Sequence, residues 1–453
     1  MEKIKLLLDK INWGYIIAGS FVINILANWI LFYFGLLGSE KNHIRSIIFV
    51  VISLLYFFIV GVKGIECFIE NKNKRKEILL SSVLPFFFIA CFIIAISRYG
   101  LKGLVYEQLK LFGIYGLSAY ASGILTAVYY KEDVLEKFEK INLIMLFPGI
   151  FTFFYYIITG SRNLGVMNYM NIAYSFLPFL FAELINYVRE TPLLELKLKK
   201  KVNIYRLLVI SLYWVIIIGS GTRGAIFSTL GFIILLLMYT LWAKKHIKNS
   251  LISCCIIVII FFISMTGTKL PGAERMHAYL KNLSTGEIST SNEQKEVYEN
   301  LKKEIIDKSA EKKIKDNSDE EEVVIEKPKD VSGIKDRKTL YKLAFLEARS
   351  NLWGLGPMGF LKKYGMYPHN IIFELFSDLG FLVGGSGLVI IFSLIIKLLI
   401  YCRQDEKMGY MFVFILGNAI PTLFSGCLWS CSILMFAVSY AFLYKRQIKL
   451  ASD

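Results

Sequence analysis

The sequence lacks the cysteine patterns that build zinc sites or disulfide frameworks. Its seven cysteines all lie in or beside apolar runs, and their spacing matches neither kind of site. We therefore interpret them as small core residues. They are Cys67, Cys91, Cys254, Cys255, Cys402, Cys427 and Cys431.

Two further absences narrow the class of protein. The net charge of +16 would suit a nucleic-acid ligand, but no basic face with interleaved aromatic residues is present. The excess of Lys and Arg lies in short loops between apolar runs, as the positive-inside rule requires. We predict no nucleic-acid partner. The first apolar run has no small-residue cleavage site, so we expect it to stay in the chain as a membrane span.

Long apolar runs dominate the 453 residues, of which 55% are hydrophobic. Runs of roughly 20 apolar residues can cross a bilayer as helices. They are continuous rather than alternating, which is not typical of a β-barrel. We predict an all-α polytopic membrane protein with about twelve transmembrane helices. The predicted spans are 12–37, 45–66, 78–97, 107–130, 141–160, 167–188, 204–220, 222–243, 248–266, 381–401, 409–426 and 428–444.

The loops differ in charge on the two sides of the predicted membrane. Basic clusters gather on one side, at 3–10, 72–76, 131–140, 189–201, 244–248, 403–407 and 445–449. The short loops opposite hold only Lys41, Arg45, Arg98, Lys102, Arg162 and Arg223. This asymmetry predicts cytoplasmic termini.

The same topology divides the chain into three regions. Residues 1–266 hold helices one to nine, 267–368 form a large extracytoplasmic loop, and 369–453 hold an interfacial helix and the last three spans. Within the loop, 285–332 is a charged, low-complexity insert. After it, Leu340, Leu343, Ala344 and Leu346 return at helical spacing.

The segment from Tyr367 to Glu374 carries the first candidate catalytic residue, His369. Pro368 precedes a predicted helix start, which places His369 in the first helical turn. A helix N-terminus attracts anions and lowers a histidine pKa, leaving a neutral imidazole that accepts a proton. The alternative is an interfacial histidine satisfied by water. Glu374 and Asp378 follow on one polar stripe, either orienting the imidazole or forming a solvated helix face.

Arginines in short outer loops form the second candidate group. Arg223 lies in Ser-Gly-Thr-Arg-Gly-Ala at 220–225, and Arg162 lies in Gly-Ser-Arg-Asn at 160–163. Either anchors its helix by snorkelling or binds phosphate through its planar fork. Arg98 is a weaker third case. Arg337, in the long loop, either reaches over the membrane surface or is merely solvated.

Two familiar site types are not predicted. Gly354, Gly356 and Gly359 spell GxGxxG, but no strand precedes them and no βαβ unit surrounds them. We interpret this segment as a tight turn. No outward short loop carries paired acidic residues, so a metal-dependent glycan transferase is disfavoured. We predict no metal and no cofactor.

Several of these motifs have the order and topology of a known family. They are the Thr222-Arg223-Gly224 segment opening a span, Arg162 followed by Asn168 and Asn171, and Arg337 followed by Gly354-Leu355-Gly356, His369-Asn370 and Gly380. With the large loop after the ninth span, the chain resembles the bacterial O-antigen ligase and O-antigen polymerase superfamily, integral membrane glycosyltransferases of the GT-C type. The insert at 285–332 has no counterpart in that pattern.

The resemblance implies a bacterial cell membrane, an extracytoplasmic active site and a glycan donor on undecaprenyl diphosphate. Arg162 and Arg223 would stabilise the leaving diphosphate, and His369 would be the base. Substrate-binding residues would be Arg337, Arg98, Asn370, Tyr367 and Glu374. Our first expectation is a cell-surface polysaccharide polymerase. The alternatives are a ligase that uses a lipid, protein or wall acceptor, and a transporter of lipid-linked glycan. Expected partners are membrane lipid and a chain-length regulator or flippase.

Overall fold

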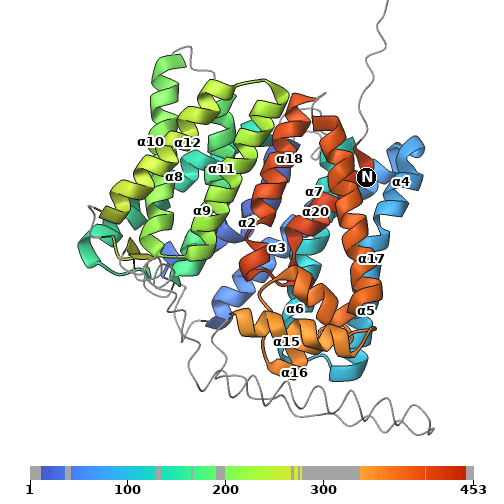
Figure 1. Ribbon diagram of the computed structural model, residues 1–453. Helices are drawn as coiled ribbons and strands as arrows, with labels where there is room; N and C mark the ends of the chain where they lie inside the picture. The colour runs from blue at the N-terminus through green and yellow to red at the C-terminus, as the bar shows by residue number, and fades with distance from the viewer. Residues whose placement is uncertain are drawn as a thin grey trace, which may run out of the picture.

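The computed structural model describes residues 12–35, 42–128, 134–164, 167–189, 199–266, 270–273, 276–277, 337–402 and 405–444. The insert predicted at 285–332 lies outside these residues. The described part is almost entirely helical and contains no β-strand (Figure 1). The prediction of an all-α membrane protein is confirmed at this level.

The helices follow one another along the chain, and the longest connection separates α12 from α15. They are α2 (Trp13–Tyr33), α3 (Asn42–Glu70), α4 (Arg75–Ser81), α5 (Val83–Tyr99), α6 (Gly103–Leu111), the π-helix η3 (Phe112–Gly116), α7 (Leu117–Val128), α8 (Val134–Thr159), α9 (Tyr169–Val188), α10 (Lys199–Ser220), α11 (Arg223–Ala243), α12 (Ile247–Thr266), α15 (Arg337–Ser350), α16 (Gly359–Tyr364), α17 (Ile371–Cys402), α18 (Glu406–Ala419), α19 (Thr422–Ser425) and α20 (Ser432–Leu443).

Eight of the predicted spans coincide with helical segments that are long and apolar enough to cross a membrane. They are Lys72–Tyr99, Val105–Val128, Val134–Thr159, Asn203–Ser220, Arg223–Ala243, Ile247–Thr266, Ile371–Cys402 and Glu406–Ser425. The other four predicted spans coincide with α2, α3, α9 and α20. Their assignment as membrane spans, and hence the count of twelve, stays a prediction.

Helix α17 is bent where the sequence predicted a change from an interfacial helix to a span. Gly380 has φ +70° and ψ 176°, which divides α17 into 371–379 and 381–402. A side chain at Gly380 would meet the carbonyl oxygen of Leu352, since a Cβ built there lies 2.0 Å from it. Glycine is therefore required by both the backbone angles and the close approach.

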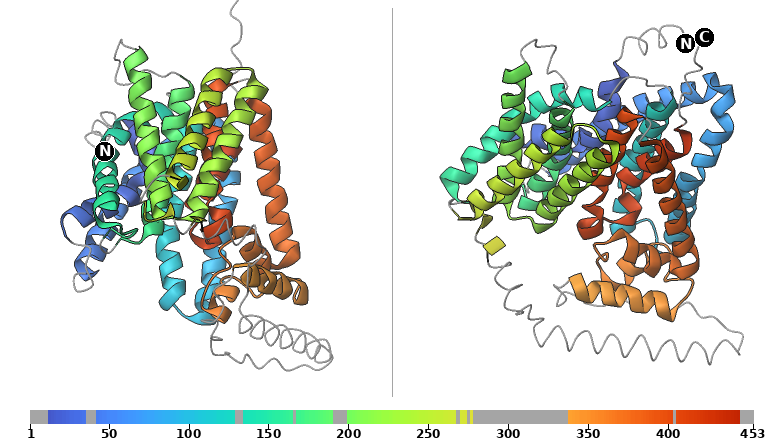
Figure 2. Two further views of the ribbon diagram at one scale, coloured as in Figure 1. Left: turned by 60° about the vertical axis from the view of Figure 1, so that its left-hand side comes forward. Right: turned by 45° about the horizontal axis from the view of Figure 1, so that its top comes forward.

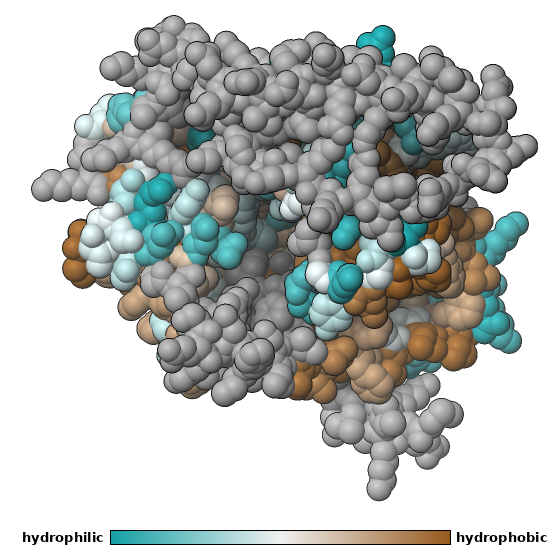
Figure 3. All heavy atoms as spheres, turned by 90° about the horizontal axis from the view of Figure 1, so that it is seen from below, coloured by the Kyte–Doolittle hydropathy of each residue, from teal (hydrophilic) through white to brown (hydrophobic). Residues whose placement is uncertain are grey.

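Helices α15 and α16 lie across one end of the helical bundle, beside the first part of α17 (Figures 1 and 2). Leu340, Leu343 and Ala344 of α15 are buried against Phe360 and Tyr364. This small core explains the helical spacing of apolar residues seen in the sequence. We call this end of the bundle the α15 end. Figure 3 views it and shows hydrophilic patches beside hydrophobic surface.

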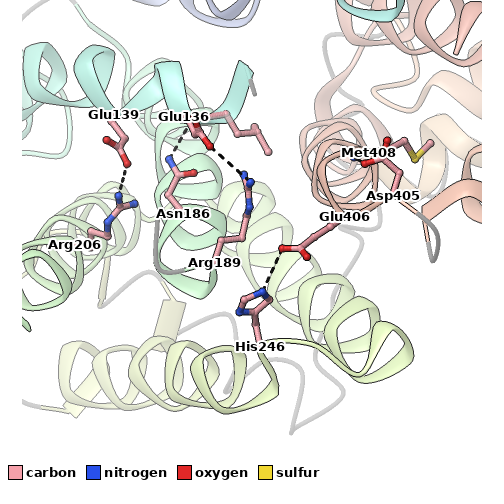
Figure 4. Close-up of polar contacts among 10 residues, drawn as sticks. Glu136, Glu139, Asn186, Arg189, Arg206, His246, Asp405, Glu406 and Met408 are labelled. Carbon is pink, nitrogen blue, oxygen red and sulfur yellow. Dashed lines mark hydrogen bonds and ion pairs between the residues drawn. The ribbon is translucent and has the colours of Figure 1, made fainter. Parts of the chain in front are cut away.

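The opposite end of the bundle contains buried ion pairs (Figure 4). Arg206 of α10 is fully buried, donates a hydrogen bond to Glu139 of α8, and lies 3.6 Å from Glu183 of α9. Asn142 donates to the other oxygen of Glu183 at 2.6 Å. These contacts join three helices through charge and hydrogen bonding.

Candidate functional site

The residues around the start of α17 are held by an asparagine cap. The side-chain oxygen of Asn370 accepts hydrogen bonds from the backbone N–H groups of Ile372 and Phe373, at 2.9 and 3.3 Å. Its amide nitrogen donates to the carbonyl oxygen of Leu423 at 2.9 Å. Asn370 is thus the N-cap, and the helix begins at Ile371. The prediction that His369 lies in the first turn is wrong, because His369 precedes the cap.

His369 has an unusual backbone for a residue other than glycine. Its φ is +60°, in the left-handed region. Its ring lies 4.4 Å, centroid to centroid, from the ring of Tyr367. Strained backbone conformations of this kind cluster at functional sites, and they persist only where the surrounding structure holds them in place. The Asn370 cap and the Tyr367 ring are two such constraints.

An arginine, two tyrosines and a serine form hydrogen bonds beside His369. Arg337, the first residue of α15, donates to the Ser425 hydroxyl at 3.5 Å. The hydroxyls of Ser425 and Tyr174 are hydrogen-bonded at 2.8 Å. Tyr367 donates to the Ser425 carbonyl oxygen at 3.5 Å. We call Tyr174, Arg337, Tyr367, His369 and Ser425 the Arg337 cluster.

Burial and the nearby charge of Arg337 lower the pKa of His369 from 6.5 to about 4. The imidazole is therefore neutral at pH 7. This direction agrees with the sequence prediction, but its cause differs from the predicted helix N-terminus. Burial also raises the pKa of Tyr367 to about 12, so its hydroxyl stays protonated and can donate a hydrogen bond.

Arg162 contacts the start of α9, the helix that also carries Tyr174 of the cluster. Its guanidinium lies 4.5 Å from the ring centroid of Tyr169, the first residue of α9. Its Nη1 atom is buried and has no hydrogen-bond partner among the residues that the structure describes. A buried guanidinium N–H without a partner favours binding of an anion.

Arg223 is exposed at the start of α11, where α11 meets α9. The hydroxyl of Thr222 donates to the Tyr169 carbonyl oxygen at 3.4 Å. A Cβ on Gly224 would lie 2.3 Å from the Tyr174 hydroxyl. The glycine after Arg223 therefore lets Tyr174 approach α11. Through α9, the structure brings Arg162 and the start of α11 next to the Arg337 cluster.

Arg98 makes its contacts at a different place. It is exposed at the end of α5, and a Cβ on Gly356 would lie 2.5 Å from its Nη1 atom. Gly354 and Gly356 have φ of +74° and +86°, as the predicted tight turn requires. Within the described residues, these contacts join Arg98 to the glycine turn rather than to the Arg337 cluster.

Glu374 and Asp378 are fully buried, so their interpretation as a solvated helix face is wrong. Glu374 accepts from the Leu428 backbone N–H at 2.6 Å and from the Cys427 thiol at 3.2 Å. With both carboxylate oxygens occupied, this geometry does not support the predicted substrate contact for Glu374.

Asp378 holds the glycine turn against α17. Its carboxylate accepts from the backbone N–H groups of Met358 and Phe360, at 3.1 and 2.8 Å, and from the Trp429 indole at 2.8 Å. The turn also bonds directly to α17, since Gly356 N–H donates to the Asp378 carbonyl oxygen at 2.8 Å. Asp378 thereby fixes how α16 and the turn sit on α17.

No protein-family model, curated protein or solved structure matches this chain. The resemblance to the O-antigen ligase and polymerase superfamily stays a prediction from the sequence. Among the residues that the structure describes, no group of three or more His, Cys, Asp or Glu side chains is placed to hold a metal ion. The positive charge near His369 comes from Arg337.

Proposed function

We propose that this chain is a membrane glycosyltransferase that extends a cell-surface polysaccharide. It would move glycan from an undecaprenyl diphosphate carrier onto a lipid-linked repeat unit. The observation that carries the proposal is the Arg337 cluster: a neutral histidine beside an arginine, at one end of a bundle of apolar helices.

The arginines suit the leaving group of this reaction. When the anomeric carbon separates from the carrier, the diphosphate gains negative charge that must be stabilised. Arg337 and Arg162 form no ion pair with a carboxylate among the described residues, so their charge is available to an anion. Guanidinium groups match phosphate oxygens through parallel N–H bonds.

The neutral His369 imidazole can accept the proton that the acceptor hydroxyl loses in this reaction. As the acceptor hydroxyl oxygen bonds to the anomeric carbon, its proton passes to the His369 imidazole and the bond to the diphosphate oxygen breaks. Direct attack of this kind inverts the anomeric configuration. A pKa of about 4 makes His369 a weak base in the free protein. A bound diphosphate would offset the charge of Arg337 and raise that pKa, which strengthens the base when substrate is present.

The acceptor must reach His369 at the edge of the membrane. His369 lies two residues before the apolar α17, so a sugar held on a membrane lipid is suitably placed. We assign the site to the extracytoplasmic face of a bacterial cell membrane, with cytoplasmic termini. In support, the described connections at the opposite end hold the basic clusters at 72–76 and 244–248.

The test uses purified protein in detergent and lipid-linked oligosaccharide extracted from a strain that lacks the gene. We expect a ladder of glycans with increasing repeat number on a gel. His369→Ala should lower the rate by about 10²–10⁴-fold, the usual contribution of a positioned base. His246→Ala is the matched control, because His246 pairs with Glu406 at 3.2 Å on the other side of the molecule.

Other results would exclude the proposal in distinct ways. Elongation by His369→Ala at the wild-type rate would exclude the histidine base. Transfer of the donor glycan to a different acceptor without a ladder would identify a ligase. Absence of any transfer in detergent, together with movement of the lipid across sealed vesicles, would identify a transporter.

A further inference from the structure

An apolar groove of about 380 Å³ runs between α17, α18, α19 and α20. Its walls are almost entirely hydrocarbon. This volume falls within the roughly 300–1,000 Å³ that is usual for ligand pockets. The residues that line it include Leu388 and Phe392 of α17, Leu416 of α18, Leu423 of α19 and Ala437 of α20.

One end of this groove adjoins the Arg337 cluster. Ile371, Ile372 and Leu423 line it there. Leu423 accepts the Asn370 hydrogen bond through its carbonyl oxygen and precedes Ser425 by two residues. Ser425 in turn bonds Arg337 and Tyr174. A molecule in the groove would therefore have one end beside a cationic, hydrogen-bonding site.

The groove extends through most of one bilayer leaflet. Its α20 wall runs from Ile433 to Ala441, which spans about 12 Å at 1.5 Å per residue. The hydrocarbon of one leaflet is about 15 Å thick. Phe392, which lines the groove, is 57% exposed. A lipid chain can thus reach the groove sideways from the membrane.

We propose that this groove binds the polyprenyl chain of the lipid-linked glycan donor while the Arg337 cluster binds its diphosphate. The inference rests on the proposed function and adds to it the side of α17 on which the donor lies. Continuity between an apolar groove and a cationic end is the arrangement that a phosphate-bearing lipid requires. A second apolar cavity, of about 260 Å³, lies between α17 and helices α4, α5 and α20, and it provides an internal control.

The experiment fills each cavity with a large side chain and varies the length of the lipid. Ala419→Trp and Ala437→Trp fill the groove, since both alanines line it and are partly exposed. Val383→Trp fills the second cavity. Each protein is assayed in detergent with a long-chain donor, the glycan on an eleven-isoprene diphosphate, and a short-chain donor, the same glycan on a methyl diphosphate. Thermal unfolding checks that each variant folds.

We expect the groove variants to lower kcat/KM for the long-chain donor by about 10-fold or more and to leave the short-chain donor within about twofold of wild type. Val383→Trp should change neither donor by more than about twofold. Two groove variants are used so that one misfolded protein does not decide the result.

Three outcomes would overturn the groove assignment while the proposed function stands. The groove variants could lose both donors equally, Val383→Trp could selectively lose the long-chain donor, or no variant could distinguish the donors. Failure of wild-type protein to transfer glycan from either donor would instead overturn the proposed function. A photoreactive polyprenyl diphosphate should also label α17 or α20, and full displacement of that label by phosphatidylglycerol would assign the groove to ordinary membrane lipid.

Discussion

The two ends of the helical bundle both carry arginine and histidine, but they pair these side chains differently. At the end opposite α15, Arg206 contacts Glu139 and Glu183, and Arg189 lies 3.9 Å from Glu136. His246 there lies 3.2 Å from Glu406, which also pairs with Lys245 at 2.8 Å. Figure 4 shows Arg206 pointing toward Glu139, Arg189 toward Glu136 and His246 toward Glu406.

At the α15 end, the cationic side chains around the start of α17 contact hydroxyl groups and rings, whereas Lys363 of α16 pairs with Glu347 of α15 at 2.7 Å. Arg337 bonds the Ser425 hydroxyl, Arg162 stacks on Tyr169, and His369 lies beside Tyr367. Within the described residues, none of these three side chains has a carboxylate partner. The nearby buried carboxylates, Glu374 and Asp378, accept hydrogen bonds from backbone, thiol and indole groups instead.

This difference distinguishes charged side chains that stabilise the fold from charged side chains that are available to bind a ligand. A buried cation paired with carboxylates joins helices, and removal of one partner leaves an uncompensated charge. A cation held near a membrane without a carboxylate partner retains its attraction for an anion from outside the protein. The comparison therefore assigns anion binding to Arg337 and Arg162 at the α15 end, and helix joining to the carboxylate-paired arginines at the opposite end.

The largest expected contrast is between two arginine substitutions. Arg337→Ala should lower kcat/KM by about 10²–10³-fold, as loss of one donor to a developing negative charge usually does, with little change in thermal stability. Arg206→Met should destabilise the fold by about 3–5 kcal/mol, because Glu139 and Glu183 would stay buried without their partner. Transfer assays and thermal unfolding in detergent measure both effects. An inactive but fully stable Arg206→Met, or an unfolded Arg337→Ala, would contradict the assignment.

A smaller effect concerns the pH dependence of His369. Burial and Arg337 hold its pKa at about 4, so Arg337→Gln should raise the pKa toward its ordinary value of roughly 6.5. The acidic limb of kcat/KM should therefore move to higher pH in this variant. An NMR titration of the histidine ring checks the same shift directly. If the pKa of His369 stays near 4 in Arg337→Gln, burial alone causes the shift.

The lowered pKa of His369 also predicts how the folding stability of the protein depends on pH. Between about pH 4 and pH 6.5 the unfolded chain binds the His369 proton and the folded chain does not. Stability should therefore rise with pH across this window, and the contribution should be constant above it. His369→Gln should remove this slope, whereas His246→Gln should leave it in place.

The sequence predicted the positions of the helices well, because apolar runs and helix boundaries are local properties. The sequence also predicted the boundary between the interfacial helix and the span near Gly380, and the tight turn at Gly354 and Gly356. Glycine is favoured at these positions because it readily adopts the backbone angles found there. The charges of the loops indicated that Arg162, Arg223 and His369 lie on the same side of the membrane. The structure places Arg162 and the start of α11 next to the Arg337 cluster through α9.

Tertiary contacts account for what the sequence could not predict. Tyr174 and Ser425 are 251 positions apart, and neither lies in a motif. The stripe formed by Glu374 and Asp378 has the same spacing whether it faces water or the polar interior of the protein. Only the position of the segment at 427–429, which donates to both carboxylates, decides between those two cases.

The smallest effect should come from Asp378→Asn, which tests the role of carboxylates at the α15 end. Asparagine keeps the shape but offers one acceptor oxygen where three donors converge, so stability should fall by about 1–3 kcal/mol. The rate of glycan transfer should stay within about tenfold of wild type, because a residue that only positions the turn costs less than a lost base. Thermal unfolding and transfer assays on the same preparation give both values. If Asp378→Asn loses as much activity as His369→Ala and keeps normal stability, Asp378 takes part in the reaction. The α15 end would then use a carboxylate in catalysis as well as its arginines and histidine.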